Sequence, residues 1–316
     1  MTSVQITECV VLAEGLQFPE APIAMPDGSI VFTEIAAERI SRVRPVAGGG
    51  WSGVETVAEV PGGPNGLAVG PDGAFYCCNN GGSLEWARIN TMILPGPRPS
   101  TWRGGSIDRV DPKTGTVTTL YRKATNSDVD LRGPNDLMFD AHGGFWFTDH
   151  GTRTLRSADR TGIWYALADG SQCEEKVHPA DGPNGIGLSP SGDRVVWVET
   201  HSGRAYWREI TAPGEVEPVD RVTRGVLASP GIGLFDSLAM DAHGNACVAT
   251  IGPGGITSIA PDGTWTHYLM PTEVFDPLTT NICFGGPDMR TAYITQSAFG
   301  RLIAVPWPTA GLALAH

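Results

Sequence analysis

The sequence has few basic residues for its length. Its 316 residues include 22 Lys and Arg against 34 Asp and Glu, which gives a formal net charge of −12 at pH 7. A protein that binds nucleic acid needs a basic surface to neutralise phosphates, so the charge balance argues against nucleic acid as a partner. An acidic chain is compatible with a bound divalent cation, but bulk charge alone is weak evidence for one.

Long hydrophobic runs are also absent. No apolar segment approaches the roughly 20 residues that span a bilayer, and residues 1–8 have neither the basic region nor the apolar run of a signal peptide. The six cysteines include the adjacent pair Cys77-Cys78 and show no spacing typical of a zinc site. We therefore expect reduced, mostly buried thiols in a cytoplasmic protein without a membrane partner.

Glycine and proline are abundant in contrast, with 41 and 25 copies, and many lie in a phrase that occurs six times. Each copy has a polar leading residue, a short apolar strand, a turn seven positions after the leading residue, and a second apolar strand. The six leading residues are Glu20, Asn65, Asn135, Asn184, Asp236 and Asn281. They are separated by 45, 70, 49, 52 and 45 residues, and a period of about 45–50 residues is typical of a β-propeller.

The predicted fold is all-β, a six-bladed β-propeller of four-stranded antiparallel blades in a single domain spanning residues 1–316. The last repeat lacks a fourth strand, so we expect residues 5–12 to supply it and to close the ring, which removes an open sheet edge. The 70-residue spacing contains an insertion at about 79–105. We expect this insertion over the channel mouth, as a lid or as the contact of a homo-oligomer.

The six leading residues should form a ring around one mouth of the central channel, because the first strand of each blade lines that channel. Two are carboxylates and four are primary amides. All offer oxygen, the ligand atom of calcium, magnesium and manganese. Turn capping is the alternative, since Asn and Asp often cap turns before a strand. Capping does not account for the longer side chain of Glu20, and a buried carboxylate needs a counter-charge.

Four segments of the sequence resemble the senescence marker protein/gluconolactonase (regucalcin-like) family, which is related to calcium-dependent phosphotriesterases. The segments are Phe18-Pro19-Glu20-Ala21-Pro22, Arg132-Gly133-Pro134-Asn135-Asp136, Pro183-Asn184-Gly185-Ile186 and Phe235-Asp236-Ser237-Leu238-Ala239-Met240-Asp241. The resemblance covers nearly the whole chain and implies a divalent metal held by Glu20, Asn184 and Asp236. It places Asn135 beside the metal, as a ligand or as a substrate contact.

The resemblance also implies the cofactor and one further contact. Calcium is the expected ion, with manganese, magnesium or zinc as alternatives. Arg132 corresponds to an arginine that binds substrate hydroxyls in some members. One residue more separates it from Asn135 than the family pattern has, so the correspondence is loose.

Several other residues should face the same mouth. The loops between the second and third strands of the blades contribute His150 and His201. His150 could shuttle a proton because the pKa of a free imidazole lies near neutrality, and His201 could contact the substrate. A partly exposed loop histidine without a catalytic role is the other interpretation of both. Asn65 could line the pocket or cap its turn.

The expected function is a metal-dependent hydrolase that opens a small-molecule lactone, a sugar lactone or a related cyclic ester. The metal would polarise the carbonyl and activate a water, with Asp236 as the general base, and the alkoxide would take a proton from solvent or from His150. An arginine-containing wall would favour sugar lactones and an aromatic wall bulkier ones. The alternatives are a phosphotriesterase-like hydrolase and a non-catalytic calcium-binding propeller.

Overall fold

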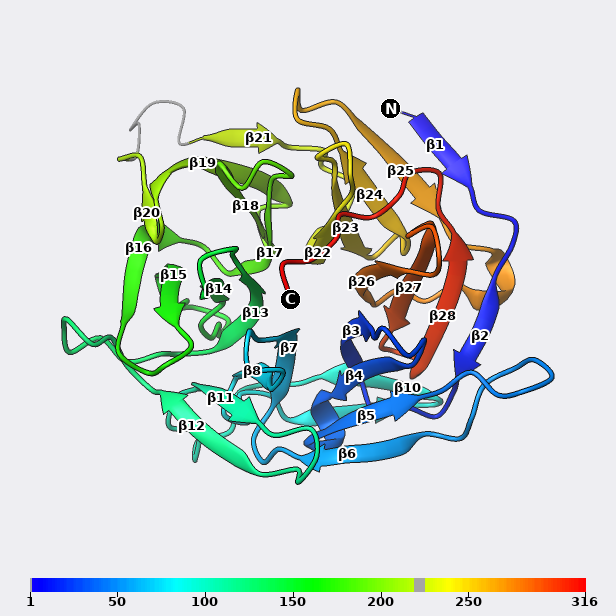
Figure 1. Cartoon of the computed structure of the whole chain (residues 1–316), viewed down its shortest axis with the longest axis horizontal. Helices are drawn as coiled ribbons and strands as arrows, with labels where there is room; N and C mark the ends of the chain where they lie inside the picture. The colour runs from blue at the N-terminus through cyan, green and yellow to red at the C-terminus, as the bar shows by residue number, and fades with distance from the viewer. Residues whose placement is uncertain (1, 219–224) are drawn as a thin grey trace.

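The computed structural model describes residues 2–218 and 225–316, which form almost only β-strands. Six sheets surround a central channel like the blades of a propeller (Figure 1), so the predicted fold is confirmed. The described helical segments are two 3-10 turns, η1 (Ile35–Ala37) and η2 (Thr272–Val274). Within the described residues, no helix has the length and apolar character that crossing a membrane requires.

The blades follow one another along the chain, and each has its innermost strand first. Blade one contains β3 (Pro19–Ala24), β4 (Ile30–Glu34), β5 (Arg39–Val43) and β6 (Glu55–Glu59). Blade two contains β7 (Pro64–Val69), β8 (Phe75–Asn79), β11 (Ser106–Val110) and β12 (Val117–Tyr121). Blade three contains β13 (Pro134–Phe139), β14 (Gly144–Asp149), β15 (Thr161–Leu167) and β16 (Cys173–Ala180).

The second half of the ring is built in the same way. Blade four contains β17 (Pro183–Leu188), β18 (Arg194–Glu199) and β19 (Arg204–Ala212), which pairs with both β20 (Glu215–Val216) and β21 (Val226–Ala228). Blade five contains β22 (Leu234–Met240), β23 (Ala246–Ile251), β24 (Ile256–Ile259) and β25 (Trp265–Leu269). Blade six contains β26 (Thr279–Gly285), β27 (Thr291–Gln296) and β28 (Arg301–Pro306).

The N-terminal residues complete two blades instead of one. We expected residues 5–12 to form a single strand on the last blade. Instead β1 (Thr2–Gln5) pairs in parallel with β25 as a fifth strand of blade five, and β2 (Val10–Ala13) pairs antiparallel with β28. The chain turns between them because Ile6 is buried and its amide donates to the Leu269 carbonyl. Closure of the last blade by an N-terminal strand is thus confirmed, with the strand at Val10–Ala13.

The insertion at 79–105 contains a short hairpin, β9 (Trp86–Ile89) paired with β10 (Met92–Pro95). Its apolar side packs on blades one and six: the Trp86 and Phe18 rings lie 4.8 Å apart, and the Ile93 amide donates to the Ala298 carbonyl at 2.8 Å. Its second half reaches blade three, where Arg98 donates to the Thr152 hydroxyl at 2.9 Å. The insertion is therefore an ordered strap with contacts on three blades.

Apolar side chains fill the spaces between blades, and apolar side chains also line one end of the central channel. A cavity of about 1020 Å³ follows the channel there, with apolar residues of all six innermost strands in its wall. The C-terminal residues cover this end: the Leu312 amide donates to the Met240 carbonyl, and the chain end lies over the centre of the ring (Figure 1). All six cysteines are free thiols, as predicted.

Candidate active site

Bulges at the channel mouth position the six leading residues. In every innermost strand, the register against the second strand shifts at or beside the leading residue. A bulge turns a side chain out of the regular alternation and is common next to active sites. The innermost strands also contact one another in sequence, and β26 contacts β3, which completes the circle. The leading residues therefore lie in one ring, as the repeat predicted.

Two glycines allow neighbouring strands to approach at this level. A Cβ on Gly66 would lie 2.4 Å from the Asn135 carbonyl oxygen, and one on Gly185 would lie 2.5 Å from the Leu238 amide nitrogen. Hydroxyl groups then bind one blade to the next, since Thr33 donates to the Asn65 carbonyl at 2.8 Å. These contacts explain the glycine of the Pro-Asn-Gly phrase as a packing requirement.

Glu20 is the most buried of the leading carboxylates, with 2% of its surface exposed. One of its oxygens, Oε2, accepts the Asn281 amide at 2.8 Å and the Ala21 backbone N–H at 2.9 Å. Ala21 has a φ of +43°, a left-handed conformation that costs an L-residue on the order of 1–2 kcal/mol. The strained backbone and the Asn281 contact fix the position of the carboxylate.

Asn184 and Asp236 lie beside each other on neighbouring blades. The Asn184 side chain donates to the Thr200 hydroxyl at 3.0 Å and accepts the Ser237 hydroxyl at 3.2 Å. Its orientation is therefore set, with its oxygen toward blade five. Asp236 is only partly buried, in contrast to the other leading residues. Of the two leading carboxylates it is the more exposed.

Asn135 has an unusual feature, because its side-chain oxygen is buried and has no hydrogen-bond partner. An unsatisfied buried polar atom costs on the order of 1–3 kcal/mol, and a water, a ligand or a cation in contact with the atom would remove this cost. Asn281 differs, since its oxygen accepts the Ile282 amide at 2.7 Å while its nitrogen donates to Glu20. Asn281 thus supports Glu20 and caps its own strand.

A third carboxylate, Asp136, joins the ring and was missed in the sequence. It is buried and accepts the Leu137 amide at 2.9 Å. Burial, and then the charge of Glu20, raise its pKa to about 8. The same two causes raise the pKa of Asp236 well above its usual range, and burial raises the pKa of Glu20. A signal was available, because aspartate stands here where blades two and four have Gly66 and Gly185.

The donor set fits a hard divalent cation. Among the described residues, no three His, Cys, Asp or Glu side chains are arranged to hold a metal ion, so amide oxygens would have to complete any such site. Asn135 offers a buried oxygen without a partner, and Asn184 offers one with a single hydroxyl contact. Burial raises the pKa of all three carboxylates, and the charge of Glu20 raises it further in Asp136 and Asp236, so the three require a positive charge to ionise together.

The two histidines lie together near the mouth. The rings of His150 and His201 are 5.8 Å apart, and both lie beside Gly182, two residues before Asn184. Burial, and then the neighbouring His201, lower the pKa of His150 to about 4. His150 is therefore neutral at neutral pH, which argues against the donor role considered above. His201 is exposed.

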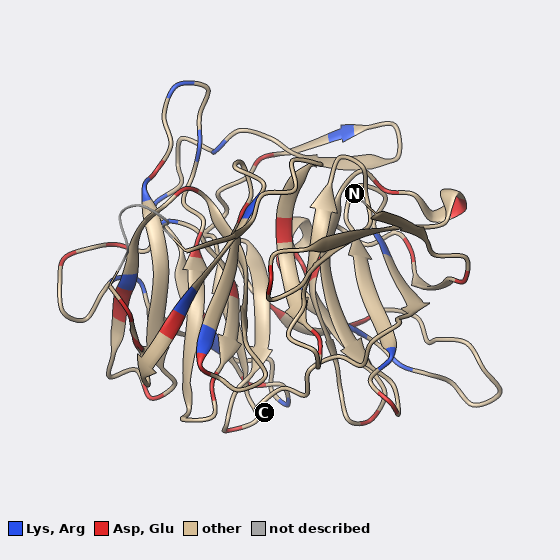
Figure 2. Ribbon diagram, turned by 90° about the horizontal axis from the view of Figure 1, so that it is seen from above, with Lys and Arg blue, Asp and Glu red and all other residues tan. Residues whose placement is uncertain are grey.

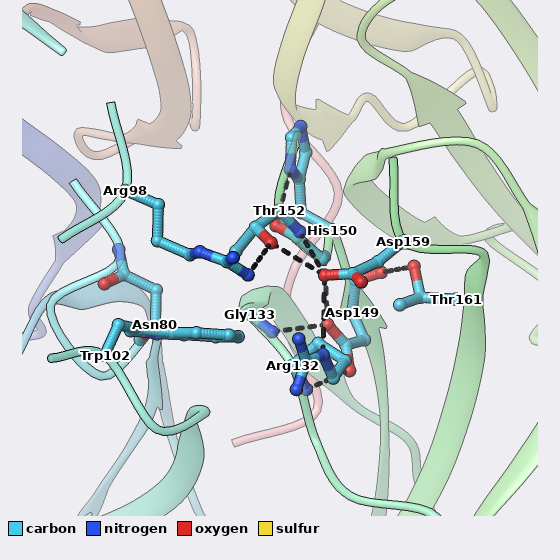
Figure 3. A network of polar contacts seen from close by, with 11 residues as sticks. Asn80, Arg98, Trp102, Arg132, Gly133, Asp149, His150, Thr152, Asp159 and Thr161 are labelled. Atoms are coloured by element: carbon cyan, nitrogen blue, oxygen red, sulfur yellow. Dashed lines mark hydrogen bonds and ion pairs between the residues drawn. The ribbon is translucent and has the colours of Figure 1, made fainter. Parts of the chain in front are cut away.

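Arg132 belongs to a polar network that joins blade three to the insertion (Figure 3). The carboxylate of Asp149 accepts the backbone amides of Arg132 and Gly133 at 2.7 and 2.6 Å, which fixes the chain just before Asn135. The Arg132 guanidinium lies 3.4 Å from the Asp159 carboxylate and over the Trp102 ring, 4.5 Å from its centroid.

The insertion contributes the other half of this network. The Arg98 guanidinium lies 5.0 Å from the centroid of the same Trp102 ring. Its Nη1 donates to the Thr152 hydroxyl, which in turn donates to the Asp159 carboxylate at 2.8 Å. The sequence did not indicate this pairing, because residues 98 and 152 lie on loops of different blades and no repeat relates them.

Comparison with known proteins finds one family that matches most of the chain. Residues 18–298 match the sequence profile described as SMP-30/Gluconolactonase/LRE-like region. A gluconolactonase from Zymomonas mobilis is 27% identical over 315 aligned positions, covering 92% of this chain and 79% of the relative.

Two solved structures share the fold. A gluconolactonase from Xanthomonas campestris superposes with a TM-score of 0.72 at 20% identity, over 95% of this chain and 89% of the other. A calcium-binding regucalcin from Agrobacterium tumefaciens superposes with a TM-score of 0.72 at 19% identity, over 100% and 99%.

Proposed function

The chain belongs to the SMP-30/gluconolactonase/LRE-like family, and we propose on this basis that it hydrolyses a lactone at the ring of leading residues. Family membership supports lactone opening as the reaction class. The observation that carries the assignment to this mouth is the juxtaposition of Glu20, Asn184 and Asp236 with the unpartnered oxygen of Asn135.

Glu20, Asn184 and Asp236 would hold a divalent cation, with Asn135 as a further ligand or as a contact to the substrate. Calcium is the first candidate, because the donors are all oxygen and because one structural neighbour is a calcium-binding regucalcin. Manganese, magnesium and zinc are the alternatives. When bound, such a cation supplies charge that polarises a carbonyl and lowers the pKa of a water.

The side chains at the mouth would supply the general base and the contacts that orient the substrate. Asp236 is the accessible carboxylate and acts as the general base toward the attacking water. Asn135 orients the lactone through its free amide oxygen or its amide N–H groups. His150 lies near the mouth in its neutral form, and the proton for the leaving alkoxide comes from solvent.

The wall of the mouth favours a sugar-type lactone over a bulky apolar one. Trp102 supplies the aromatic surface that an apolar substrate would use, but the guanidinium groups of Arg98 and Arg132 cover its ring. The indole N–H is occupied as well, since it donates to the Asn80 carbonyl at 2.8 Å. The wall therefore presents N–H donors, which suit hydroxyl-rich substrates.

The test is hydrolysis of sugar and non-sugar lactones by metal-stripped protein, with and without added calcium, manganese, magnesium or zinc. We expect ring opening that depends on the added ion and falls by at least about 10²-fold in Asp236→Asn. Asp262→Asn is the matched control, because it makes the same chemical change in an exposed turn between β24 and β25.

Two outcomes would overturn the proposal. Full activity in Asp236→Asn would move the reaction away from the ring. Tight calcium binding without turnover of any lactone would identify the ring as a structural or regulatory site, and phosphotriesters would then be tried in the same assay. Loss of activity in Asp262→Asn as well would trace the effect to folding, so circular dichroism of both variants accompanies the kinetics.

A further inference from the structure

We propose that the lactone carries an anionic substituent remote from its carbonyl, and that Arg98 and Arg132 bind this group. The inference rests on the proposed function and deepens it by naming the substrate class. It concerns the surface defined by Arg98, Trp102, Arg132 and Thr152, which we call the arginine wall. A carboxylate, sulfonate or phosphate group has the oxygen geometry that a guanidinium recognises.

The arginine wall is rigidly placed at the mouth. Trp102 is 9% exposed, and its indole N–H donates to the Asn80 carbonyl, while the Asn80 amide donates to the Gly63 carbonyl at 2.9 Å. Gly63 is two residues before the leading residue Asn65. Trp102 is thereby held between the rims of blades two and three, and both guanidinium groups lie against its ring.

Both guanidinium groups keep N–H donors free. Among the described residues, Arg98 has no acidic partner and uses one nitrogen on the Thr152 hydroxyl. Arg132 meets one carboxylate, that of Asp159, at 3.4 Å. That carboxylate also accepts the backbone N–H and the hydroxyl of Thr152, at 2.9 and 2.8 Å, so its charge is shared among several donors. The surplus of positive charge at this wall contrasts with the net charge of −12 for the whole chain.

The other acidic group close to the wall is turned away from it. Asp149 is buried, and its oxygens accept the backbone amides of Arg132, Gly133 and Gly151. It anchors the loop through these backbone contacts. Figure 3 shows the Arg98 side chain reaching across toward Thr152, on the side of the network opposite Asp149.

The wall is within reach of a substituent on a lactone bound at the ring. Arg132 precedes Asn135 by three residues, so their Cα atoms are at most about 11 Å apart, and the Arg132 side chain extends from there. A lactone whose carbonyl meets the carboxylates and Asn135 would direct its exocyclic carbon away from them. An anionic group on that carbon fits the unpaired donors of Arg98.

The experiment compares three lactones in the metal-loaded protein: gluconolactone, its phosphate ester at the primary hydroxyl, and the analogue with a carboxylate in place of the hydroxymethyl group. We expect kcat/KM at least about tenfold higher for one of the anionic lactones, since a charged hydrogen bond contributes on the order of 1.5–3 kcal/mol. The preference should lie in KM and should fall with added sulfate.

Arg98→Gln should abolish this preference, while Arg98→Lys, which retains the charge, should keep part of it. Arg122→Gln is the control, because it removes one exposed positive charge from blade two. Hydrolysis of gluconolactone with equal or poorer activity on both anionic lactones would overturn the inference and leave the proposed function standing. An unchanged preference in Arg98→Gln would overturn it as well. Failure on all three lactones would instead count against the proposed function.

Discussion

At the scale of single residues, burial decides what each polar group can do. His150 and His142 are both loop histidines in the sequence, yet His150 lies beside a second histidine near the mouth and His142 is exposed on a far turn. Burial of the His150 ring, and then the neighbouring His201, lower the pKa of His150 to about 4. Such a shift links the ionisation of the residue to the stability of the fold.

His150→Gln should therefore reduce the acid sensitivity of the protein. The pKa of His150 falls from 6.5 to about 4 on folding, so the unfolded chain binds the proton first. The stability associated with neutral His150 is present above about pH 6.5 and is lost as the pH falls toward 4. One pKa unit corresponds to about 1.4 kcal/mol of unfolding free energy. Because His150 is partly exposed, we expect the acid-dependent loss of unfolding free energy to be about 2 kcal/mol.

Urea unfolding at pH 7, 6 and 5 measures this difference. The free energy of unfolding should fall less with acidification in His150→Gln than in the wild type. His142→Gln makes the same change at an exposed turn and should follow the wild-type curve. Parallel curves for all three proteins would show that His150 is not held neutral by the fold.

The sequence identified the candidate ligands but not their surroundings. The six leading residues stood out because a repeat places equivalent positions side by side. Asp136 was missed although the Asn135-Asp136 pair departs from the Pro-Asn-Gly phrase. The Arg98–Thr152 contact and the pKa of His150 could not be found, since both depend on how loops of different blades pack in space.

At the scale of elements, the two N-terminal strands contribute unequally. All four residues of β1 are exposed, and the strand lies at an edge of blade five. In β2, Leu12 is 5% exposed and packs in a cluster with Phe32 of blade one and Leu302 of blade six. The second strand thus joins the first blade to the last, whereas the first strand only extends a sheet.

Deletion of residues 1–5 should be tolerated, and deletion of residues 1–13 should not. Loss of β2 leaves β28 as an open edge and removes a buried leucine, which alone costs about 2–5 kcal/mol. Soluble yield and thermal unfolding of the two truncated proteins test this. A 1–13 deletion that melts like the 1–5 deletion would mean that β2 does not close the ring.

At the scale of the whole molecule, the candidate cation site connects blades that are far apart in the sequence. Glu20, Asn135, Asn184 and Asp236 lie on blades one, three, four and five. The site thus depends on the closed ring, which the sequence predicted because the repeat period and the strand content both indicated six blades.

The placement of β1 on blade five was not predictable, because a parallel edge strand carries no turn signal and no periodic partner. Figure 2 shows Lys and Arg distributed among Asp and Glu along the described part of the ribbon.

Calcium should raise the melting temperature of the metal-stripped protein. A ligand at 100 times its Kd stabilises the folded state by about 2.7 kcal/mol, which corresponds to roughly 4 °C for a chain of this size. The shift should be absent or much smaller in Asp236→Asn and should be retained in Asp262→Asn. Scanning calorimetry with and without each ion measures it. Equal shifts in all three proteins would place the cation elsewhere.

Closure of the last blade by β2 and β28 has a consequence for the order in which the protein can be made. A ribosome delivers the N-terminus first, and domains generally begin to fold as they emerge. Val10 and its partner Ala304 are separated by nearly the whole chain, so β2 waits without its partner until synthesis is almost complete. During that interval the nascent chain exposes an unpaired strand edge at each end. A second chain translated from the same mRNA could pair with either edge first.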